Sequence, residues 1–215
     1  MLDLPSVTLI CADCVNVDRA IAVLELCKAK CTFAAVKLFT HLPTDYPHKV
    51  AIEPLVSLSD YSDWCLTRMY QCIETPHIIT VQHDGWILDT KAWNPAWLQC
   101  DYIGPLFLQE HSVDENSVGS GGFSFRSKAL MKYVASISPK WERGQWPHED
   151  GEICKHHRLR LQAAGFKFAS ALEASRFAQG GNPNPAYYVE RPFGYHGMWA
   201  NIHRDTGVVD PWPWP

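Results

Sequence analysis

Four short segments of the sequence carry residue types that could take part in chemistry, and the first is Gln82-His83-Asp84-Gly85. In this segment an acidic side chain follows a very apolar stretch and precedes a glycine. Carboxylate oxygens suit Mg²⁺ or Mn²⁺, and such ions need only one or two carboxylates when phosphate oxygens complete their coordination. Asp84 could therefore hold a divalent cation against a diphosphate, although an aspartate in a turn can also simply accept backbone hydrogen bonds.

The other three segments lie in the second half of the chain. Val118–Phe125 (VGSGGFSF) has three glycines among four residues, which could admit a ligand close to the backbone or form a tight hairpin. His148-Glu149-Asp150 places two carboxylates at an expected helix start, where they could stabilise the helix dipole or supply a general base. His196 lies in a late glycine-containing loop and could ligate a metal.

The composition is that of an ordinary globular chain of 215 residues, enough for one sizeable domain. The net charge of −4 gives no general reason to expect nucleic acid or an anionic membrane as a partner. Most of the eight cysteines lie in apolar periodic segments, where free thiols behave as small hydrophobic residues. The chain has no signal-peptide pattern and no apolar run of about 18 residues, so we expect a cytoplasmic protein without a membrane span.

The hydrophobic pattern up to residue 85 alternates strands and helices. Short apolar runs predict strands at Val7–Cys11, Phe33–Phe39, Val50–Leu55 and Ile78–Val81. Helical spacing predicts a helix capped by Asn16, with apolar positions from Val17 to Cys31, and a second helix from about Ser59 to Thr75. This order is typical of an α/β domain with a largely parallel sheet, in which ligands bind beyond the carboxyl ends of the strands.

The second half is less regular. The pattern predicts a strand at Asp101–Gly104, a strand-like segment within Val118–Phe125 and a possible last strand at Phe166–Ala169. It also predicts a helix capped by Ser127 to about Ile137 and a helix from Glu149 to about Ala164. Beyond about residue 178 the chain is rich in Gly, Asn and Pro and is expected to form an irregular tail. Because we find no repeat and no linker, we expect one domain over residues 1–215.

Taken together and in this order, the four segments resemble those of GT-A-type glycosyltransferases. Such enzymes carry an acidic D-x-D motif at a strand end, a glycine loop, an x-E-D acid near a helix start and a late metal-binding histidine. Gln82-His83-Asp84 resembles a D-x-D motif whose first acid is replaced by Gln. Gly121-Gly122 corresponds to the glycine loop, His148-Glu149-Asp150 to the x-E-D acid, and His196 to the late histidine.

Five motifs narrow the resemblance to one family of poorly characterised bacterial and viral proteins, which is named as a domain of unknown function and regarded as GT-A-like. The motifs are Tyr61-Ser62-Asp63, Val81–Gly85, Asp101–Gly104, Gly121–Ser127 and Glu149-Asp150. The resemblance runs from about residue 50 to His196, and the chain departs from it at His83, where the family more often has Trp. It implies a Rossmann-like, three-layer α/β/α fold with a mixed, mostly parallel sheet.

The resemblance implies that the protein transfers a sugar from a nucleotide-sugar, expected to be a UDP-sugar, to an acceptor hydroxyl. The base of the donor would lie near Ala12-Asp13-Cys14. Asp84 and His196 would hold Mn²⁺ or Mg²⁺ on the donor diphosphate, which Gln82 and His83 would flank.

On the other side of the reaction, the resemblance implies that Gly121 and Gly122 turn backbone donors toward the sugar or phosphate. Asp150 would deprotonate the acceptor hydroxyl, which gives inversion at the anomeric carbon, and Glu149 is the second choice for this base. Arg126 could contact a phosphate or be a solvated ion-pair partner.

The acceptor and two other functions stay open. The acceptor could be a glycan or lipid-linked sugar, or a hydroxymethylated base in DNA as in phage-type DNA modification, against which the net negative charge argues mildly. A non-catalytic nucleotide-sugar or carbohydrate binder would explain the missing first acid. A metal-dependent phosphoesterase could be built on Asp84, Asp150 and His196. Release of nucleoside diphosphate from nucleotide-sugars would separate the transferase from both.

Overall fold

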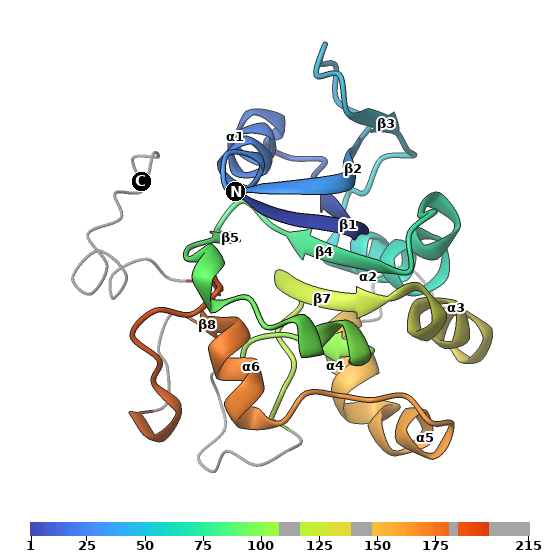
Figure 1. The fold of residues 1–215 in the computed structure, drawn as a ribbon. Helices are drawn as coiled ribbons and strands as arrows, with labels where there is room; N and C mark the ends of the chain where they lie inside the picture. The colour runs from blue at the N-terminus through green and yellow to red at the C-terminus, as the bar shows by residue number, and fades with distance from the viewer. Residues whose placement is uncertain (108–116, 139–147, 181–184, 198–215) are drawn as a thin grey trace.

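The structure, a computed structural model, describes residues 1–107, 117–138, 148–180 and 185–197. Its centre is a six-stranded sheet with the strand order β3-β2-β1-β4-β7-β6 (Figure 1). Five strands run in the same direction, and β7 runs antiparallel to its neighbours β4 and β6. The strands are β1 Leu2–Ala12, β2 Cys31–Thr40, β3 Lys49–Ala51, β4 His77–Val81, β6 Tyr102–Ile103 and β7 Phe123–Ser127. The predicted mixed, mostly parallel sheet is confirmed.

Helices cover both faces of this sheet. The helix α1 (Val17–Lys28) packs on one face, while α2 (Leu58–Thr67) and α3 (Lys128–Ile137) pack on the other. Successive side chains of a strand point to opposite faces, so Leu9 joins the hydrophobic cluster of α1 and Ile10 joins that of α2 and α3. The result is the expected three-layer α/β/α arrangement.

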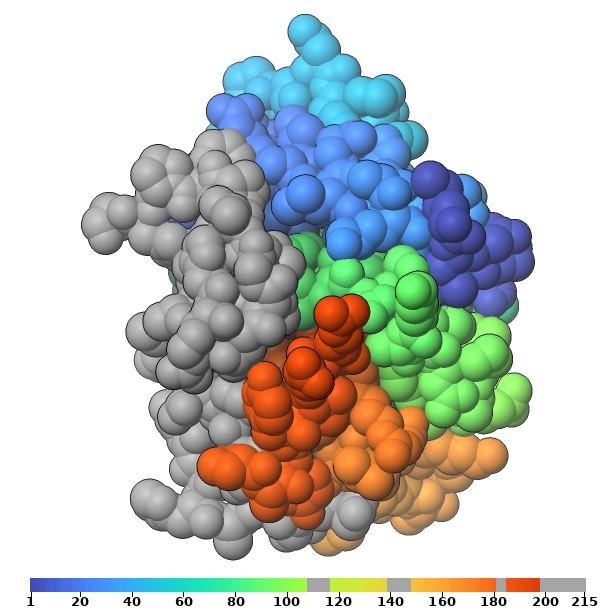
Figure 2. Space-filling view, turned by 60° about the vertical axis from the view of Figure 1, so that its left-hand side comes forward, coloured from blue at the N-terminus to red at the C-terminus, as the bar shows by residue number. Residues whose placement is uncertain are grey.

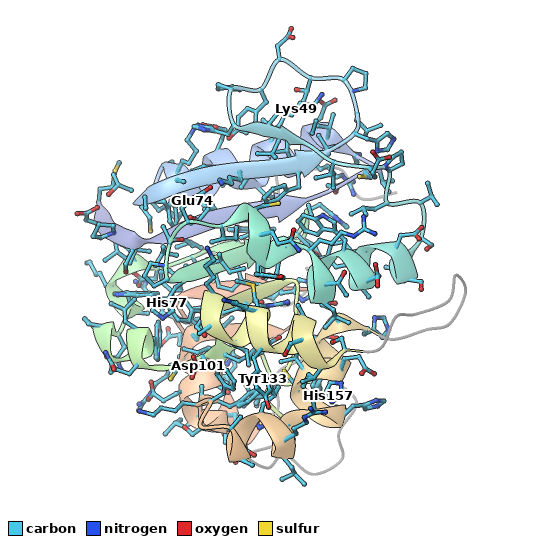
Figure 3. The ribbon with its side chains drawn as sticks, turned by 90° about the vertical axis from the view of Figure 1, so that its right-hand side faces the viewer. Lys49, Glu74, His77, Asp101, Tyr133 and His157 are labelled. Carbon is cyan, nitrogen blue, oxygen red and sulfur yellow. The ribbon has the colours of Figure 1, made fainter. Side chains whose placement is uncertain are left out.

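A third hydrophobic cluster lies beside β6 and is formed largely by helical segments of the second half. Its helical members in the second half come from α3, from a π-helical turn at Glu152–His156, from α5 Arg158–Ala163 and from α6 Ala171–Phe177. The short helix α4 Glu149–Gly151 leads into the π-helical turn. Asp101 fixes this region to the sheet, because its carboxylate accepts hydrogen bonds from Ser127 Oγ at 2.6 Å and from the Lys167 backbone N–H at 2.8 Å. Figure 3 shows Asp101 near the helices of this side of the molecule.

A second, smaller sheet includes two short segments of the region predicted to be an irregular tail after residue 178; residues 181–184 and 198–215 of that region lie outside the described ranges. Its strands are β5 (Gly85–Ile87), β9 (Gly194–His196) and β8 (Ala178–Gly180), in the order β5-β9-β8. Each strand has three residues, which is too short for an alternating pattern to be recognised in the sequence, and each pairs with a distant segment. In Figure 2 the green segment that contains β5 lies between the blue α1 side and the orange α6 side of the molecule.

Several predicted boundaries are also corrected. The helix expected to reach Thr75 ends at Thr67, whose hydroxyl donates to the Asp63 carbonyl at 2.7 Å, and a 3₁₀ turn at Met69–Cys72 follows. The helix expected from Glu149 to about Ala164 is broken by the π-helical turn, and the strand expected at Phe166–Ala169 is reduced to a single bridge to Tyr102. The third strand ends at Ala51, three residues before Pro54.

Two predicted helix caps are confirmed. Asn16 caps α1 through a 3.1 Å hydrogen bond from the Arg19 N–H, and Ser127 caps α3 through a 3.0 Å bond from the Leu130 N–H. All eight cysteines are free thiols. None of the helices in the described ranges has the length and hydrophobicity that a bilayer crossing requires.

Candidate functional site

Three loops leave the main sheet at the same edge. Cys11, Val81 and Phe123 lie side by side in neighbouring strands, so the segments that adjoin them in the chain extend from one line across the sheet. These segments are Ala12-Asp13-Cys14 after β1, Gln82-His83-Asp84 after β4, and the glycine loop 119–122 before β7. Because β7 is antiparallel, its amino end lies at the carboxyl edge of the parallel strands. The fold therefore brings together loops that are about 110 residues apart in the chain, counted from Asp13 to the glycine loop.

The pairing of β5 with β9 brings His196 beside Asp84. His196 lies opposite Gly85 in this ladder, and the Gly197 N–H donates to the Asp84 carbonyl at 3.2 Å. His196 Nε2 is 3.4 Å from Asp84 Oδ1, while its Nδ1 is 3.0 Å from Ser120 Oγ. Two side chains separated by 112 positions, which the resemblance assigns to one metal, are thus neighbours in the structure.

The carboxylate of Asp84 is negatively charged, and one of its oxygens has no hydrogen-bond partner among the described residues. Burial raises the pKa of its carboxyl, but the neighbouring imidazoles of His196 and His83 outweigh burial, and the pKa lies below its ordinary value. Asp84 Oδ1 is buried and has no hydrogen-bond partner among the described residues, since 3.4 Å is beyond the usual range for N–H···O bonds. A buried anionic oxygen without a donor is a favourable ligand for a cation.

The separation of the two side chains also fits a divalent ion. Two ligands that are each about 2.1 Å from one ion lie no more than about 4.2 Å apart, and Asp84 Oδ1 and His196 Nε2 are 3.4 Å apart. The described residues contain no group of three His, Cys, Asp or Glu side chains that could hold a metal ion. Asp84 and His196 could therefore hold Mn²⁺ or Mg²⁺ only together with other oxygen ligands, such as those of a diphosphate.

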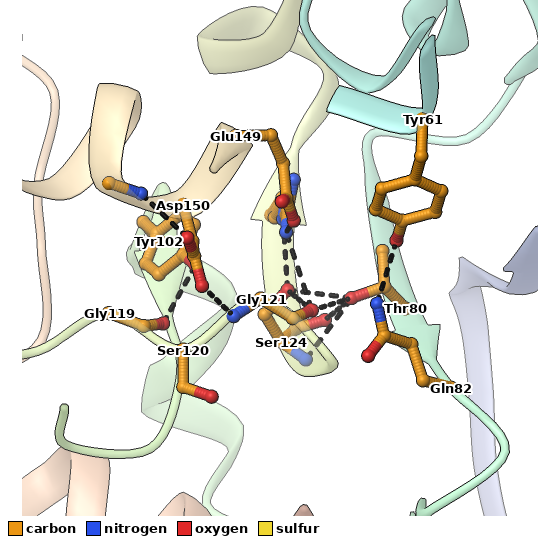
Figure 4. A network of polar contacts seen from close by, with 12 residues as sticks. Tyr61, Thr80, Gln82, Tyr102, Gly119, Ser120, Gly121, Ser124, Glu149 and Asp150 are labelled. Carbon is orange, nitrogen blue, oxygen red and sulfur yellow. Dashed lines mark hydrogen bonds and ion pairs between the residues drawn. The ribbon is translucent and has the colours of Figure 1, made fainter. Parts of the chain in front are cut away.

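The residues around Asp84 are held by a hydrogen-bond network (Figure 4). The Gln82 backbone N–H donates to the Gly122 carbonyl at 2.8 Å. The Gln82 side chain donates from Nε2 to Tyr61 Oη, and its Oε1 lies 3.2 Å from His196 Nε2. His83 is half-buried beside this network.

The glycine pair is required by the close approach of side chains from elsewhere in the chain. A Cβ atom on Gly122 would lie 1.9 Å from His196 Nε2, and one on Gly121 would lie 2.1 Å from Glu149 Oε1. Neither residue has a positive φ. The resemblance expects backbone donors of this loop to face the sugar or phosphate. In the structure the Gly121 N–H is instead engaged, because it donates to Asp150 Oδ2 at 2.8 Å.

Glu149 and Asp150 are adjacent but have different surroundings. Glu149 is 5% exposed and its Oε1 lies 2.8 Å from Nη2 of Arg126, which is 1% exposed. Burial, and then the charge of Asp150, raise the pKa of Glu149, and Arg126 opposes them. Asp150 is only partly buried and accepts hydrogen bonds from the backbone N–H groups of Gly121 and Gly151.

This arrangement separates the two candidate bases. Glu149 is committed to a buried ion pair, which ties the start of α4 to β7. Arg126 is therefore neither solvated nor turned to an open phosphate site, as the sequence alone had allowed. Asp150 has a partly exposed carboxylate that accepts two backbone hydrogen bonds from the described residues, so it keeps lone pairs within that part of the chain and is the better placed of the two to receive a proton.

The loop after β1 is ordered by its own aspartate. Asp13 Oδ1 accepts hydrogen bonds from the backbone N–H groups of Val15 and Asn16 at 2.7 and 2.8 Å. Burial, and then the charges of Asp13, Cys27 and Asp84, raise the pKa of the Cys11 thiol. The predicted base-binding segment Ala12-Asp13-Cys14 thus lies on the same edge of the sheet as Asp84.

A cavity of about 360 Å³ lies beyond the carboxyl end of β3. Its walls come from the chain after β3 and from α2, and include Ile52, Pro54, Leu55, Asp63, Trp64 and Arg68. The Trp64 ring packs at 4.9 Å from the ring of Phe39, which pairs in the sheet with Ala12. The cavity is therefore on the same side of the fold as the segment 12–14.

Some polar groups of the region were missed by sequence reasoning. Ser120 gave no signal apart from its place between glycines, and Thr80, whose Oγ1 is 2.9 Å from the Gly121 carbonyl oxygen, lies within an apolar strand. His156 and His157, which helical geometry would point apart, both approach the buried carboxylate of Glu152, at 2.8 and 3.5 Å. The π-helical turn that they end changes the spacing of their side chains.

Comparisons with solved structures identify the fold. The chain is similar to a glycosyltransferase involved in the glycosylation of the major capsid of PBCV-1, with 11% identity, a TM-score of 0.57 and coverage of 89% of this chain and 92% of that one. A mannosyltransferase from Pyrobaculum calidifontis in complex with GDP-Man and Mn²⁺ has 11% identity and a TM-score of 0.48, with coverage of 78% and 56%. The catalytic domain of Drosophila β1,4-galactosyltransferase 7 in complex with xylobiose has 14% identity and a TM-score of 0.46, with coverage of 79% and 64%.

Sequence comparison identifies the family. Curated protein sequences give no match. A family model, described as a protein of unknown function (DUF5672), matches residues 48–196, which is more than half of the chain and spans every segment from Tyr61 to His196 discussed above. The chain therefore belongs to the DUF5672 family of unknown function and has the α/β fold of GT-A glycosyltransferases.

Proposed function

We propose that the protein transfers a sugar from a nucleotide-sugar donor to an acceptor hydroxyl. The observation that carries the proposal is the arrangement around Gly121-Gly122. Gly122 is in close contact with His196, which adjoins Asp84, and Gly121 donates a hydrogen bond to Asp150. A candidate diphosphate site and a candidate base therefore lie on two sides of one short loop. The fold shared with a viral glycosyltransferase supports this assignment.

On the donor side, Asp84 and His196 would hold Mn²⁺ or Mg²⁺ against the diphosphate. When bound, such a cation would offset the charge that develops on the leaving nucleoside diphosphate. Ser120 would orient His196 through the 3.0 Å contact with Nδ1, as residues behind a ligating histidine commonly do. Gln82 and His83 would flank the diphosphate.

The nucleoside would lie along the edge formed by Ala12-Asp13-Cys14, toward the cavity beside α2. Partly apolar cavities with a few polar groups are typical small-ligand sites, and this cavity combines Trp64 and Leu55 with Asp63. A UDP-sugar is the first donor to test.

On the acceptor side, Asp150 would accept the proton of the attacking hydroxyl. The Gly121 N–H fixes the orientation of its carboxylate before any ligand binds. Direct attack assisted by a single base gives inversion at the anomeric carbon. Glu149 would act indirectly, because its ion pair with Arg126 holds the chain next to Asp150.

For the acceptor, a glycan or lipid-linked sugar is proposed ahead of a hydroxymethylated DNA base. The net charge of −4 disfavours a polyanionic acceptor. The eight free thiols fit a reducing compartment, so we place the reaction in the cytoplasm.

The test begins with a thermal-shift screen of nucleotide-sugars in the presence of Mn²⁺ or Mg²⁺, because ligands that bind only the native state raise its stability. Donors that bind are then assayed for release of nucleoside diphosphate, and products on glycan and DNA acceptors are identified by mass spectrometry. Binding without any release would indicate a non-catalytic binder. Phosphate release from simple esters without sugar transfer would indicate a phosphoesterase.

A further inference from the structure

The side chain of Gln82 reaches into the site formed by Asp84 and His196. Gln82 Oε1 lies 3.2 Å from His196 Nε2, and the same nitrogen lies 3.4 Å from Asp84 Oδ1. Two oxygens thus flank one imidazole nitrogen, and Asp84 Oδ1 has no hydrogen-bond partner among the described residues. All three atoms can offer a lone pair to a cation.

Tyr61 determines which end of the Gln82 amide faces the site. The amide nitrogen donates a 3.2 Å hydrogen bond to Tyr61 Oη, so the amide oxygen is turned away from Tyr61 (Figure 4). This oxygen is the atom that lies 3.2 Å from His196 Nε2. The backbone of Gln82 is fixed as well, by its hydrogen bond to the Gly122 carbonyl.

We propose that Gln82 Oε1 is a third, neutral protein ligand of the divalent cation and that Tyr61 is the positioning residue that turns this oxygen toward it. This inference rests on the proposed function, in which the cation belongs to the donor site. Amide oxygens are hard ligands that Mg²⁺ and Mn²⁺ accept. A glutamine at this position completes the site without placing a second negative charge beside Asp84.

The charge of the site has a consequence for the order of binding. Among the three proposed ligands only Asp84 is anionic, so the free protein would bind a divalent cation weakly. A diphosphate adds negative oxygens to the same ion. We therefore expect Mn²⁺ to bind much more tightly when a nucleoside diphosphate is present.

The experiment is a Mn²⁺ titration of the full chain, followed by the electron paramagnetic resonance signal of free Mn²⁺, with and without UDP or GDP. Gln82→Met keeps the length of the side chain and removes the oxygen, and Tyr61→Phe removes only the hydroxyl. Tyr133→Phe is the matched control, because Tyr133 lies on α3 and packs its ring against Phe166. Melting temperatures show whether each variant is folded.

Tyr61→Phe is expected to weaken Mn²⁺ binding about 10-fold, the lower end of what loss of an orienting partner costs a metal site. Gln82→Met removes the ligand itself and should weaken binding at least as much. The control should bind as the wild type does. The double variant should bind no more weakly than Gln82→Met alone, because Tyr61 acts only through Gln82. Unchanged affinity in Gln82→Met, or a Tyr61→Phe effect that persists at full size in the double variant, would overturn the proposal.

If Gln82→Met does not fold, Gln82→Glu provides the same test with opposite sign. A carboxylate at a ligand position should tighten Mn²⁺ binding in the absence of nucleotide, and weaker binding would contradict the assignment.

The Mn²⁺ titration also separates this inference from the proposed function. Binding of Mn²⁺ that depends on Gln82 in a protein without transfer activity would refute the function and leave the ligand standing. Sugar transfer by a protein whose Mn²⁺ affinity does not change when Gln82 is replaced would support the function and refute Gln82 as a ligand.

Discussion

Carboxylates lie on both sides of the glycine pair, but their surroundings differ. On one side, Asp84 has a buried oxygen without a hydrogen-bond partner among the described residues and lies 3.4 Å from His196. On the other, Asp150 accepts hydrogen bonds from two backbone N–H groups, and Glu149 is paired with Arg126 at 2.8 Å. Within the described residues, the Asp84 side thus keeps a buried oxygen without a donor, whereas the carboxylates of the Asp150 side are held by backbone donors and by Arg126.

The difference teaches which part of the site depends on a ligand. An anionic oxygen that is buried without a donor is costly unless another group compensates it, and a cation is the natural compensation. A carboxylate that is held by backbone donors keeps its orientation in the free protein. We therefore expect substitutions near Asp84 to change ligand binding most and those near Asp150 to change turnover or stability most.

The largest expected effect follows from Asp84→Asn, which keeps the shape of the side chain and removes its charge. Transfer should fall below detection, because a divalent cation contributes several kcal/mol to stabilisation of developing charge. Mn²⁺ binding, measured in the same titration, should be lost while the fold persists. A folded Asp84→Asn protein with near-normal turnover would break the assignment of this side to the cation.

Asp150→Asn should lower turnover by about 10²–10⁴-fold, the usual contribution of a positioned general base. Donor affinity, measured by calorimetry with a nonreacting nucleoside diphosphate, should stay close to that of the wild type. An equal loss of donor affinity would instead make Asp150 a donor ligand, and the two sides of the loop would then not differ in role.

Arg126→Met should destabilise the protein by about 3–5 kcal/mol, because it leaves Glu149 as a buried and unpaired charge. Loss of the positive charge of Arg126 raises the pKa of Glu149 in the native state further above its unfolded value of about 4.3. When the pKa of a carboxyl is higher in the native state than in the unfolded state, the native state is favoured at pH values below the unfolded-state pKa. This contribution to stability is lost as the pH rises through the native-state pKa. In denaturant unfolding, the free energy of unfolding of the wild type should therefore exceed that of Arg126→Met by a small amount near pH 4 and by a larger amount toward pH 8.

The double variant Arg126→Met with Glu149→Leu provides the control. Replacing both partners removes the unpaired charge, so the double variant should be more stable at neutral pH than Arg126→Met alone and should lose most of the added pH dependence. If the single variant has the same pH profile as the wild type, the ion pair is not what holds the start of α4.

The smallest effects are expected from the two glycines, which form a matched pair. An added Cβ overpacks either position, at a cost of about 1–3 kcal/mol. Gly122→Ala presses on His196 and should weaken Mn²⁺ binding more than Gly121→Ala does. Gly121→Ala presses on Glu149 and should lower turnover more than it lowers Mn²⁺ affinity. Identical profiles for the two variants would show that the loop responds as one unit.

Much of the fold could be predicted because it depends on local pattern. The strands β1, β2 and β4 contain short, mostly apolar runs, and the caps Asn16 and Ser127 act within one helical turn. The three-residue strands β5, β8 and β9 could not be predicted. Each is too short for an alternating pattern to be recognised, and each is stabilised by strands from elsewhere in the chain.

The same division applies to the candidate site. The sequence by itself determined which side chains could do chemistry: Asp84 after an apolar strand, His196 between glycines, and the pair Glu149 and Asp150 at a helix start. It could not distinguish Glu149 from Asp150, because adjacent carboxylates differ only in what surrounds them. Nor could it identify Tyr61 as the partner of Gln82, since the two lie 21 positions apart.

Only the tertiary structure decided these points. The pairing of β9 with β5 placed His196 beside Asp84, and the ion pair of Glu149 with the buried Arg126 of β7 engaged Glu149 and left Asp150 available. The state of a carboxylate depends on the donors, cations and solvent within a few ångströms of it. Those neighbours come from distant parts of the chain, so they are fixed only when the chain has folded.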